Sequence, residues 1–142
     1  RGAACQTMRI LIDTNVILDI LQKREPFFAD SYRALRKAIE GDAECLISAS
    51  AATDIFYMLR KALGSAQQAK EQIEQLAQLV SFADVQGMDI HTALMRAMPD
   101  FEDAVVDAVA ERNGASYILT RNIKDFAGSV VPAILPADFL NK

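Results

Sequence analysis

The stretch Ile10–Leu18 reads ILIDTNVIL, an almost wholly apolar run with Asp13, Thr14 and Asn15 in its middle. A carboxylate among side chains suited to a core costs several kcal/mol unless a partner offsets its charge. Residues 9–12 are typical of a short buried strand, and residues 14–22 continue as an apolar helix. Asp13 is therefore expected directly after a strand, and the rest of the chain has to supply its partner.

Length and composition predict one acidic domain. The 142 residues are enough for a single core. RGAACQT, before Met8, has no periodicity, so we interpret residues 1–7 as an expression remnant and residues 8–142 as the domain. No apolar run reaches the roughly 18 residues of a membrane span and no signal peptide is recognisable, so a cytoplasmic protein is expected. The net charge of −4 lacks the basic footprint of a general nucleic-acid binder.

Strand-like and helical segments alternate along the chain. The predicted strands cover residues 9–12, 45–48, 82–85, 117–120 and 130–135. The predicted helices begin at Thr14, Pro26, Ser50, Ser65, Asp89 and Asp100, and several of them end at Gly41, Gly64, Pro99 and Asn113–Gly114. This alternation predicts a three-layer α/β/α fold with a mainly parallel sheet of about five strands.

Acidic residues follow several of these strands. Asp13 comes after the first strand, Asp54 lies in the helix after the second, and Asn122 and Asp125 follow the fourth. One helix carries an acidic stripe at i, i+3, i+7 and i+11, made of Asp100, Asp103, Asp107 and Glu111. Since the carboxyl ends of parallel strands share one edge, these oxygen ligands are expected to converge there.

Each acidic residue also has a structural explanation as a helix cap, a partner of the helix dipole, a solvated face or a turn. Clustered carboxylates repel one another, however, unless a cation joins them. His91 is the sole histidine, and Cys45 is the sole cysteine after residue 7. Oxygen ligands without paired His or Cys favour Mg²⁺ or Mn²⁺, which are typical of water attack on phosphates.

Four segments together resemble the acidic motifs of PIN domains. They are LIDTNVILD (11–19), the helix with Asp54, DFEDAVVDAVA (100–110) and TRNIKDF (120–126). The resemblance covers nearly the whole chain after Met8 and implies a parallel sheet of about five strands with the activity of a Mg²⁺- or Mn²⁺-dependent ribonuclease. Many small members of the family are toxins of toxin–antitoxin pairs and form dimers. The implied partners are therefore RNA, an antitoxin protein and a second copy of the chain.

The resemblance also assigns roles by position. It implies that Asp13, Asp54 and Asp103 bind metal as carboxylates and that Asn122 is the fourth catalytic group. Two features depart from the usual pattern, because Asp54 is one methylene shorter than the common Glu and Asn122 is an amide where many relatives have Asp. Asp107 and Asp125 are further candidate metal ligands. The candidate substrate contacts are Thr14, Asn15, Thr120 and Arg121.

Two other functions remain open from the sequence. An aspartyl-phosphate phosphatase would also place Asp13 after the first strand, but that chemistry needs a second Asp two residues later, where this chain has Asn15. The other alternative is a PIN-like domain with weakened catalysis that binds RNA or protein, which Asp54 and Asn122 support. A chelator-sensitive cleavage assay separates it from a nuclease.

Overall fold

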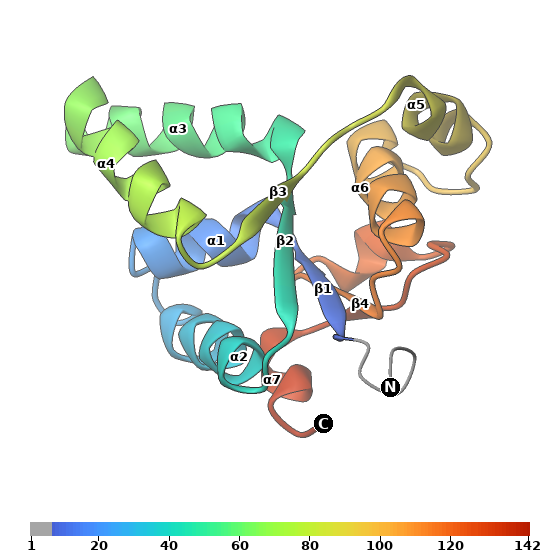
Figure 1. The fold of residues 1–142 in the computed structure, drawn as a ribbon, viewed down its shortest axis with the longest axis horizontal. Helices are drawn as coiled ribbons and strands as arrows, with labels where there is room; N and C mark the ends of the chain where they lie inside the picture. Colours follow the sequence, from blue (N-terminus) through green and yellow to red (C-terminus); the bar gives the residue numbers. More distant parts are fainter. Residues whose placement is uncertain (1–6) are drawn as a thin grey trace.

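The computed structural model describes residues 7–142, which form a five-stranded sheet flanked by helices (Figure 1). The sheet has the order β3-β2-β1-β4-β5, and every neighbouring pair is parallel. Its strands are β1 (Arg9–Ile12), β2 (Glu44–Ser48), β3 (Ser81–Ala83), β4 (Tyr117–Leu119) and β5 (Ala133–Ile134). The predicted α/β/α class is confirmed, and the carboxyl ends of the strands share one edge.

Residues 1–6 of the predicted expression remnant lie outside the described residues. Within residues 7–142, no helix combines the length and the apolar character needed to cross a membrane.

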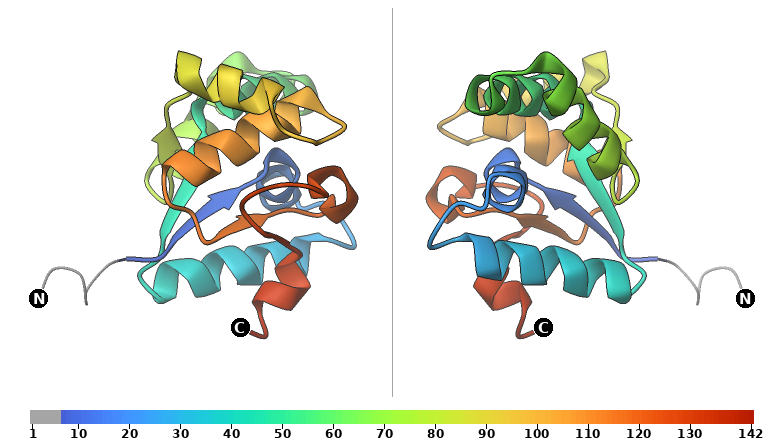
Figure 2. Two further views of the ribbon diagram at one scale, coloured as in Figure 1. Left: turned by 90° about the vertical axis from the view of Figure 1, so that its right-hand side faces the viewer. Right: turned by 90° about the vertical axis from the view of Figure 1, so that its left-hand side faces the viewer.

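Successive side chains of a strand point to opposite faces of the sheet, and the apolar ones form one core on each face. In β1, Ile10 and Ile12 face one core and Leu11 faces the other, as the two-residue period of a strand requires. Figure 2 shows α2 and α6 on opposite sides of the sheet. The first core is covered by α1 (Thr14–Leu21), α2 (Phe28–Glu40), α3 (Ala49–Leu63), α4 (Ala66–Ala77) and α7 (Pro136–Phe139). The second is covered by α5 (Gly87–Leu94) and α6 (Phe101–Arg112), with the 3₁₀ turn η2 (Ile123–Phe126) beside them.

Three predicted helix boundaries are confirmed by their capping contacts. The Ser65 hydroxyl accepts a hydrogen bond from the Gln68 amide at 3.1 Å, which satisfies a free N–H at the start of α4. The Asp100 carboxylate accepts the Asp103 amide at 2.9 Å and caps α6. Gly64 ends α3 with φ +68°, a left-handed conformation that favours glycine.

Other predicted boundaries were wrong. Ser48, at the end of β2, is the N-cap residue of α3, so Ser50 lies in the first turn of that helix and its hydroxyl is hydrogen-bonded to that of Ser48 at 2.7 Å. Pro26 precedes α2 instead of lying in its first turn, and the fifth helix spans Gly87–Leu94, earlier than predicted. The last strand is only Ala133–Ile134, because Ser129 and Val131 are engaged in a turn before it.

Asp107 holds two loops against α6. Its side chain is fully buried, and its two oxygens accept the amides of Val130 and Val131, each at 2.9 Å. Arg96, from the loop after α5, places its Nε 3.1 Å from the same carboxylate. Asp107 therefore joins α6 to segments that lie before and after it in the sequence.

Replacing Asp107 with Ala is expected to destabilise the fold by about 3–5 kcal/mol, because it leaves two backbone amides without their buried acceptor and Arg96 without its buried ion-pair partner. Urea unfolding followed by circular dichroism measures the change. Glu111→Gln is the matched control, since Glu111 also pairs with Arg96 but its side chain is 47% exposed, and a loss below about 1 kcal/mol is expected. Equal losses in the two variants would show that Asp107 has no special structural role.

Candidate active site

A cleft of about 550 Å³ opens at the carboxyl edge of the sheet, between α1, α3, α5 and α6. Its lining includes all four residues predicted as catalytic and two of those predicted to contact substrate. These are Asp13, Asp54, Asp103, Asn122, Thr14 and Asn15. They come from segments far apart in the sequence, and the parallel strand order brings those segments to one edge.

Asp13 is fixed in the cleft by hydrogen bonds from three residues. It is the N-cap residue of α1, and its Oδ1 accepts the Thr14 amide at 2.9 Å. Its Oδ2 accepts the Thr120 hydroxyl at 2.8 Å and the Asn15 amide group at 3.2 Å. Burial raises the pKa of Asp13, and the hydrogen bonds from Thr120 and Thr14 oppose that rise. No Lys or Arg among the described residues forms a salt bridge with it, so its charge lacks a cationic partner.

Asp103 lies in the first turn of α6 and shares the electrostatic environment of Asp13. Burial, followed by repulsion from Asp13, Asp100, Asp125 and Glu102, raises the pKa of Asp103 to about 7. The charge of Asp125, exposed on η2, also contributes to the raised pKa of Asp13. The site therefore concentrates negative charge, and no Lys or Arg in residues 7–142 forms a salt bridge with Asp13 or Asp103.

The donor set fits a hard divalent cation. The lining supplies carboxylate and amide oxygens but no histidine or cysteine, a combination typical of Mg²⁺ and Mn²⁺ sites. Burial is the main cause of the raised pKa of Asp103, and a cation at this point would relieve the repulsion from neighbouring carboxylates that adds to it. Over residues 7–142, no three carboxylate, imidazole or thiol groups already lie close enough together to hold an ion. Asp54, exposed on α3, and Asp125 would have to turn towards Asp13 and Asp103.

Asp107, Thr120 and Arg121 are not among the residues that line the cleft. Each Asp107 oxygen already accepts an amide, from Val130 and from Val131, and the carboxylate faces Arg96 instead of the cleft. Thr120 is fully buried, and its hydroxyl donates to Asp13 and so orients that carboxylate.

Arg121 is engaged by Asp19, a buried carboxylate that the sequence analysis did not single out. Arg121 Nε lies 2.6 Å from Asp19 Oδ2, and Nη2 lies 3.1 Å from Oδ1. The guanidinium also lies 3.8 Å from the centre of the Phe27 ring. The Arg121 amide donates to Asn15 Oδ1 at 3.3 Å, so the segment after β4 is held against α1. One feature of the sequence could have identified Asp19, because it is a second carboxylate in the same apolar segment as Asp13.

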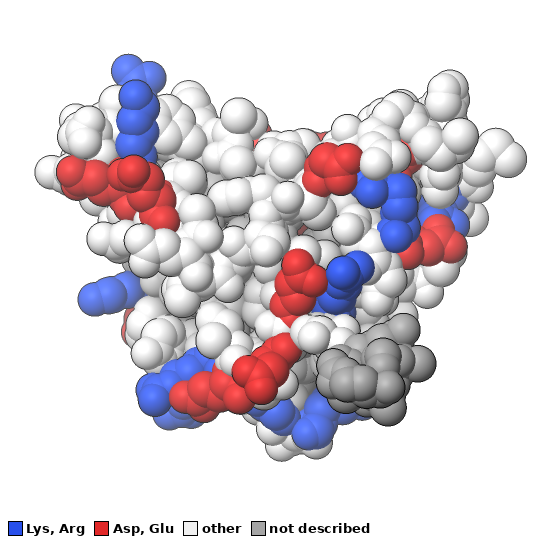
Figure 3. All heavy atoms as spheres, viewed as in Figure 1, with Lys and Arg blue, Asp and Glu red and all other residues white. Residues whose placement is uncertain are grey.

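Few cations surround the acidic residues. Arg24 lines the cleft and was missed by the sequence analysis, while Lys124 is exposed on η2. Arg9 lies at the opposite end of β1 from the cleft, where its Nε donates to Glu44 at 2.8 Å. On the face shown in Figure 3, basic side chains lie in small separate groups, most of them next to acidic ones, and form no continuous patch.

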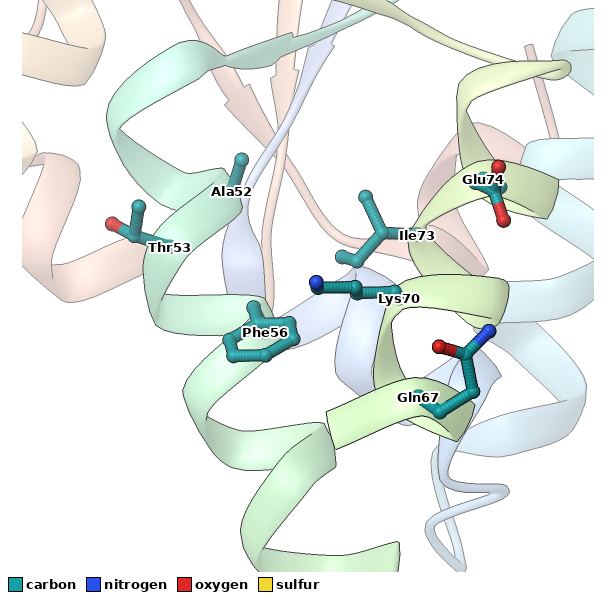
Figure 4. A pocket seen from close by; sticks show the side chains of 7 residues that line it. All are labelled: Ala52, Thr53, Phe56, Gln67, Lys70, Ile73 and Glu74. Atoms are coloured by element: carbon teal, nitrogen blue, oxygen red, sulfur yellow. The ribbon is translucent and has the colours of Figure 1, made fainter. Parts of the chain in front are cut away.

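A second hollow of about 540 Å³ lies between α3 and α4. Figure 4 shows Phe56 on α3 and Lys70 and Ile73 on α4 directed into the space between the two helices. Glu74 is the only carboxylate among the residues that line it. It lacks the grouped oxygen donors of the cleft at the sheet edge, so the cleft is the better candidate for phosphate chemistry.

Comparison with known proteins gives one family and several similar folds. The PIN domain family matches residues 9–124. No curated protein matches the chain. Among solved structures, VapBC2 from Rickettsia felis bound to a promoter DNA fragment has a TM-score of 0.72 at 14% identity, covering 90% of this chain and 98% of that chain. A toxin–antitoxin complex from Klebsiella pneumoniae has a TM-score of 0.70 at 18% identity, with coverages of 89% and 97%.

VapC20 from Mycobacterium tuberculosis, described as a toxin that cleaves the sarcin–ricin loop, has a TM-score of 0.59 at 18% identity. The match covers 77% of this chain and 86% of that chain. At such low identities, the three similarities establish a shared fold.

Without divalent metal, the free energy of unfolding should fall as pH rises from about 4 through about 7. The reason is that folded Asp103 keeps its proton at pH values where the unfolded chain has lost it, so this contribution is complete below the unfolded pKa and lost above the folded pKa. Urea unfolding in chelator at several pH values measures the slope. Asp103→Asn should flatten it, whereas Glu71→Gln, which makes the same charge change on distant α4, should not. The same slope in Asp103→Asn as in the parent would contradict this assignment.

Proposed function

Because the chain belongs to the PIN domain family, we propose that it is a divalent-metal-dependent ribonuclease with its active site in the acidic cleft. PIN domains are typically nucleases that use divalent metal ions. The observation that carries the proposal is the presence of Asp13, Asp54, Asp103 and Asn122 in the lining of one cleft. The unpaired negative charge around Asp103 supports it further.

Asp13 and Asp103 are the proposed principal ligands of Mg²⁺ or Mn²⁺, with Asp54 and Asp125 as further carboxylates. A bound ion of this type lowers the pKa of a water molecule and offsets the charge that develops on the phosphate. Asn122 contributes a neutral oxygen or orients water. Asp125 supplies the charge that Asn122 lacks, because its carboxylate already acts on both Asp13 and Asp103.

The surrounding residues of the chain keep Asp13 in one orientation. Thr120 and Asn15 both donate to Oδ2, while Oδ1 accepts the Thr14 amide. A carboxylate has about four lone-pair positions, so this arrangement leaves acceptor capacity for a cation. The ion pair between Asp19 and Arg121 fixes the segment that carries Thr120 and Asn122, which makes Arg121 a positioning residue in this proposal.

The structural similarities support a role in a toxin–antitoxin pair. The matches from Rickettsia felis and Klebsiella pneumoniae are a VapBC assembly and a toxin–antitoxin complex. We infer by analogy that this chain is the toxin of such a pair, with an antitoxin protein as a partner and a homodimer as the assembly. Co-purification with the protein encoded by the neighbouring gene tests the first partner, and sedimentation of the purified chain tests the second.

A domain that binds RNA or protein without cleavage is the competing function. Asp54 and Asn122 favour it, because a shorter carboxylate and an amide replace two groups that are often Glu and Asp in PIN domains. Asp54 is also exposed on the α3 wall of the cleft. Cleavage by the purified chain separates the two functions.

The purified chain should cleave single-stranded RNA in Mg²⁺ or Mn²⁺ and stop in chelator. Asp13→Asn should lower the rate by on the order of a hundredfold or more, because it removes the ligand charge and keeps the shape of the side chain. Asp103→Asn should have a similar effect, and Glu111→Gln, two turns further along α6, should retain the parent rate. Gel analysis of labelled RNA measures cleavage, and circular dichroism confirms folding.

Full cleavage by well-folded Asp13→Asn protein would rule out Asp13 as a metal ligand. If the parent chain binds RNA but leaves it intact in both metals, the competing function replaces the nuclease.

A further inference from the structure

The cleft has an apolar wall as well as its acidic residues. Phe101 is 48% exposed, and Ile90 and Met58 are each 37% exposed, although large apolar side chains normally gain by burial. All three line the cleft that contains Asp13 and Asp103. They come from α6, α5 and α3, so three separate elements turn an apolar side chain towards the same space.

The start of α6 holds Phe101 in this position. Asp100 caps the helix through the Asp103 amide, and Phe101 is the first helical residue. Ala104 and Val105 in the following turn are buried in the core, so the direction in which the helix faces the core is fixed. Phe101 lies one turn earlier on the same side of α6, at the first helical position, where it is 48% exposed and lines the cleft at the same end of the helix as Asp103.

The charges around this wall exclude a phosphate as its occupant. Asp100, Glu102 and Asp103 lie on either side of Phe101 in the sequence, and their carboxylates would repel an anion. Arg24 is the only cationic residue in the lining of the cleft. A flat, uncharged group is therefore the part of an RNA chain that suits the surface made by Phe101, Ile90 and Met58.

We propose that these three side chains form a subsite for one unpaired nucleobase, with the base stacked on Phe101, next to the phosphodiester that the acidic residues act on. This inference rests on the proposed ribonuclease function and names the part of the RNA that the apolar wall binds. Aromatic side chains stack on bases of any sequence, and single strands expose the base faces that duplexes hide. Stacking also gives an acidic chain affinity for RNA that does not depend on many phosphate contacts.

The test measures binding of short single-stranded RNA to the full chain in Mg²⁺, with Asp13→Asn added to prevent cleavage. Two series of RNAs are used, and in each series the probe is moved one nucleotide at a time along the strand. One series carries 2-aminopurine, whose fluorescence reports stacking, and the other carries an abasic site. Phe101→Ala should weaken binding on the order of tenfold and abolish the fluorescence change, while Phe101→Trp should retain both. Met88→Ala is the matched control, because Met88 is 67% exposed on α5 but does not line the cleft. It should bind as the parent does.

Abasic RNA provides the second arm. At one position, removing the base should lower the affinity of the parent as much as Phe101→Ala lowers the affinity for RNA with all of its bases. On that abasic RNA, Phe101→Ala should cause no further loss of affinity. Equal binding by the parent and Phe101→Ala, or an equal loss on RNA with and without the base, would overturn the subsite. A change in oligomeric state with unchanged RNA binding would also overturn it and assign the wall to a contact between copies.

These outcomes are distinct from failure of the ribonuclease proposal. Cleavage by the parent together with binding that does not depend on Phe101 rejects the base subsite alone. Phe101-dependent binding without any cleavage rejects the nuclease and retains the subsite in an RNA-binding domain.

Discussion

The carboxylate of Asp13, partly buried at the end of β1 with no cationic side chain beside it, is the constraint on which the site depends. Its amide donates to Leu119 O at 2.9 Å, which continues the pairing of β1 with β4 beyond the last ladder residue. The Thr120 hydroxyl next to Leu119 then reaches the carboxylate. The pairing of β1 with β4 therefore also places the Thr120 hydroxyl against Asp13. The negative charge of Asp13 is left to be balanced by a group in the cleft.

The acidic residues divide into those with an arginine partner and those without one. Asp19 and Asp107 are fully buried and pair with Arg121 and Arg96, so they hold segments together. Asp13 and Asp103 have raised pKa values and no arginine partner in the part of the chain described. This division separates structural carboxylates from those that are available to a cation.

The apolar periodicity and the order of segments were sufficient to predict the parallel sheet and the edge at which Asp13, Asp54 and Asp103 lie. Helical spacing also placed Asp107 on the same face as Asp103, but it could not show that the loops at Arg96 and Val130 return to that face. Arg121 was predicted to contact substrate, and its ion pair with Asp19 was missed because the two residues lie 102 positions apart in the sequence. Phe101 illustrates the same limit, since an apolar residue at the start of a helix gives no sign of whether it faces core or cleft.

The most direct test of the central claim is to locate a bound Mn²⁺ in the isotopically labelled protein from the paramagnetic broadening of its backbone amide signals. If the cleft is the divalent-cation site, substoichiometric Mn²⁺ should broaden the signals of residues 13–15, 54, 103 and 122–125 first, and Asp13→Asn should remove this selectivity. Broadening that begins at exposed acidic residues elsewhere, such as those of α4, or that spreads evenly over the chain, would contradict the assignment of the cleft as a metal centre.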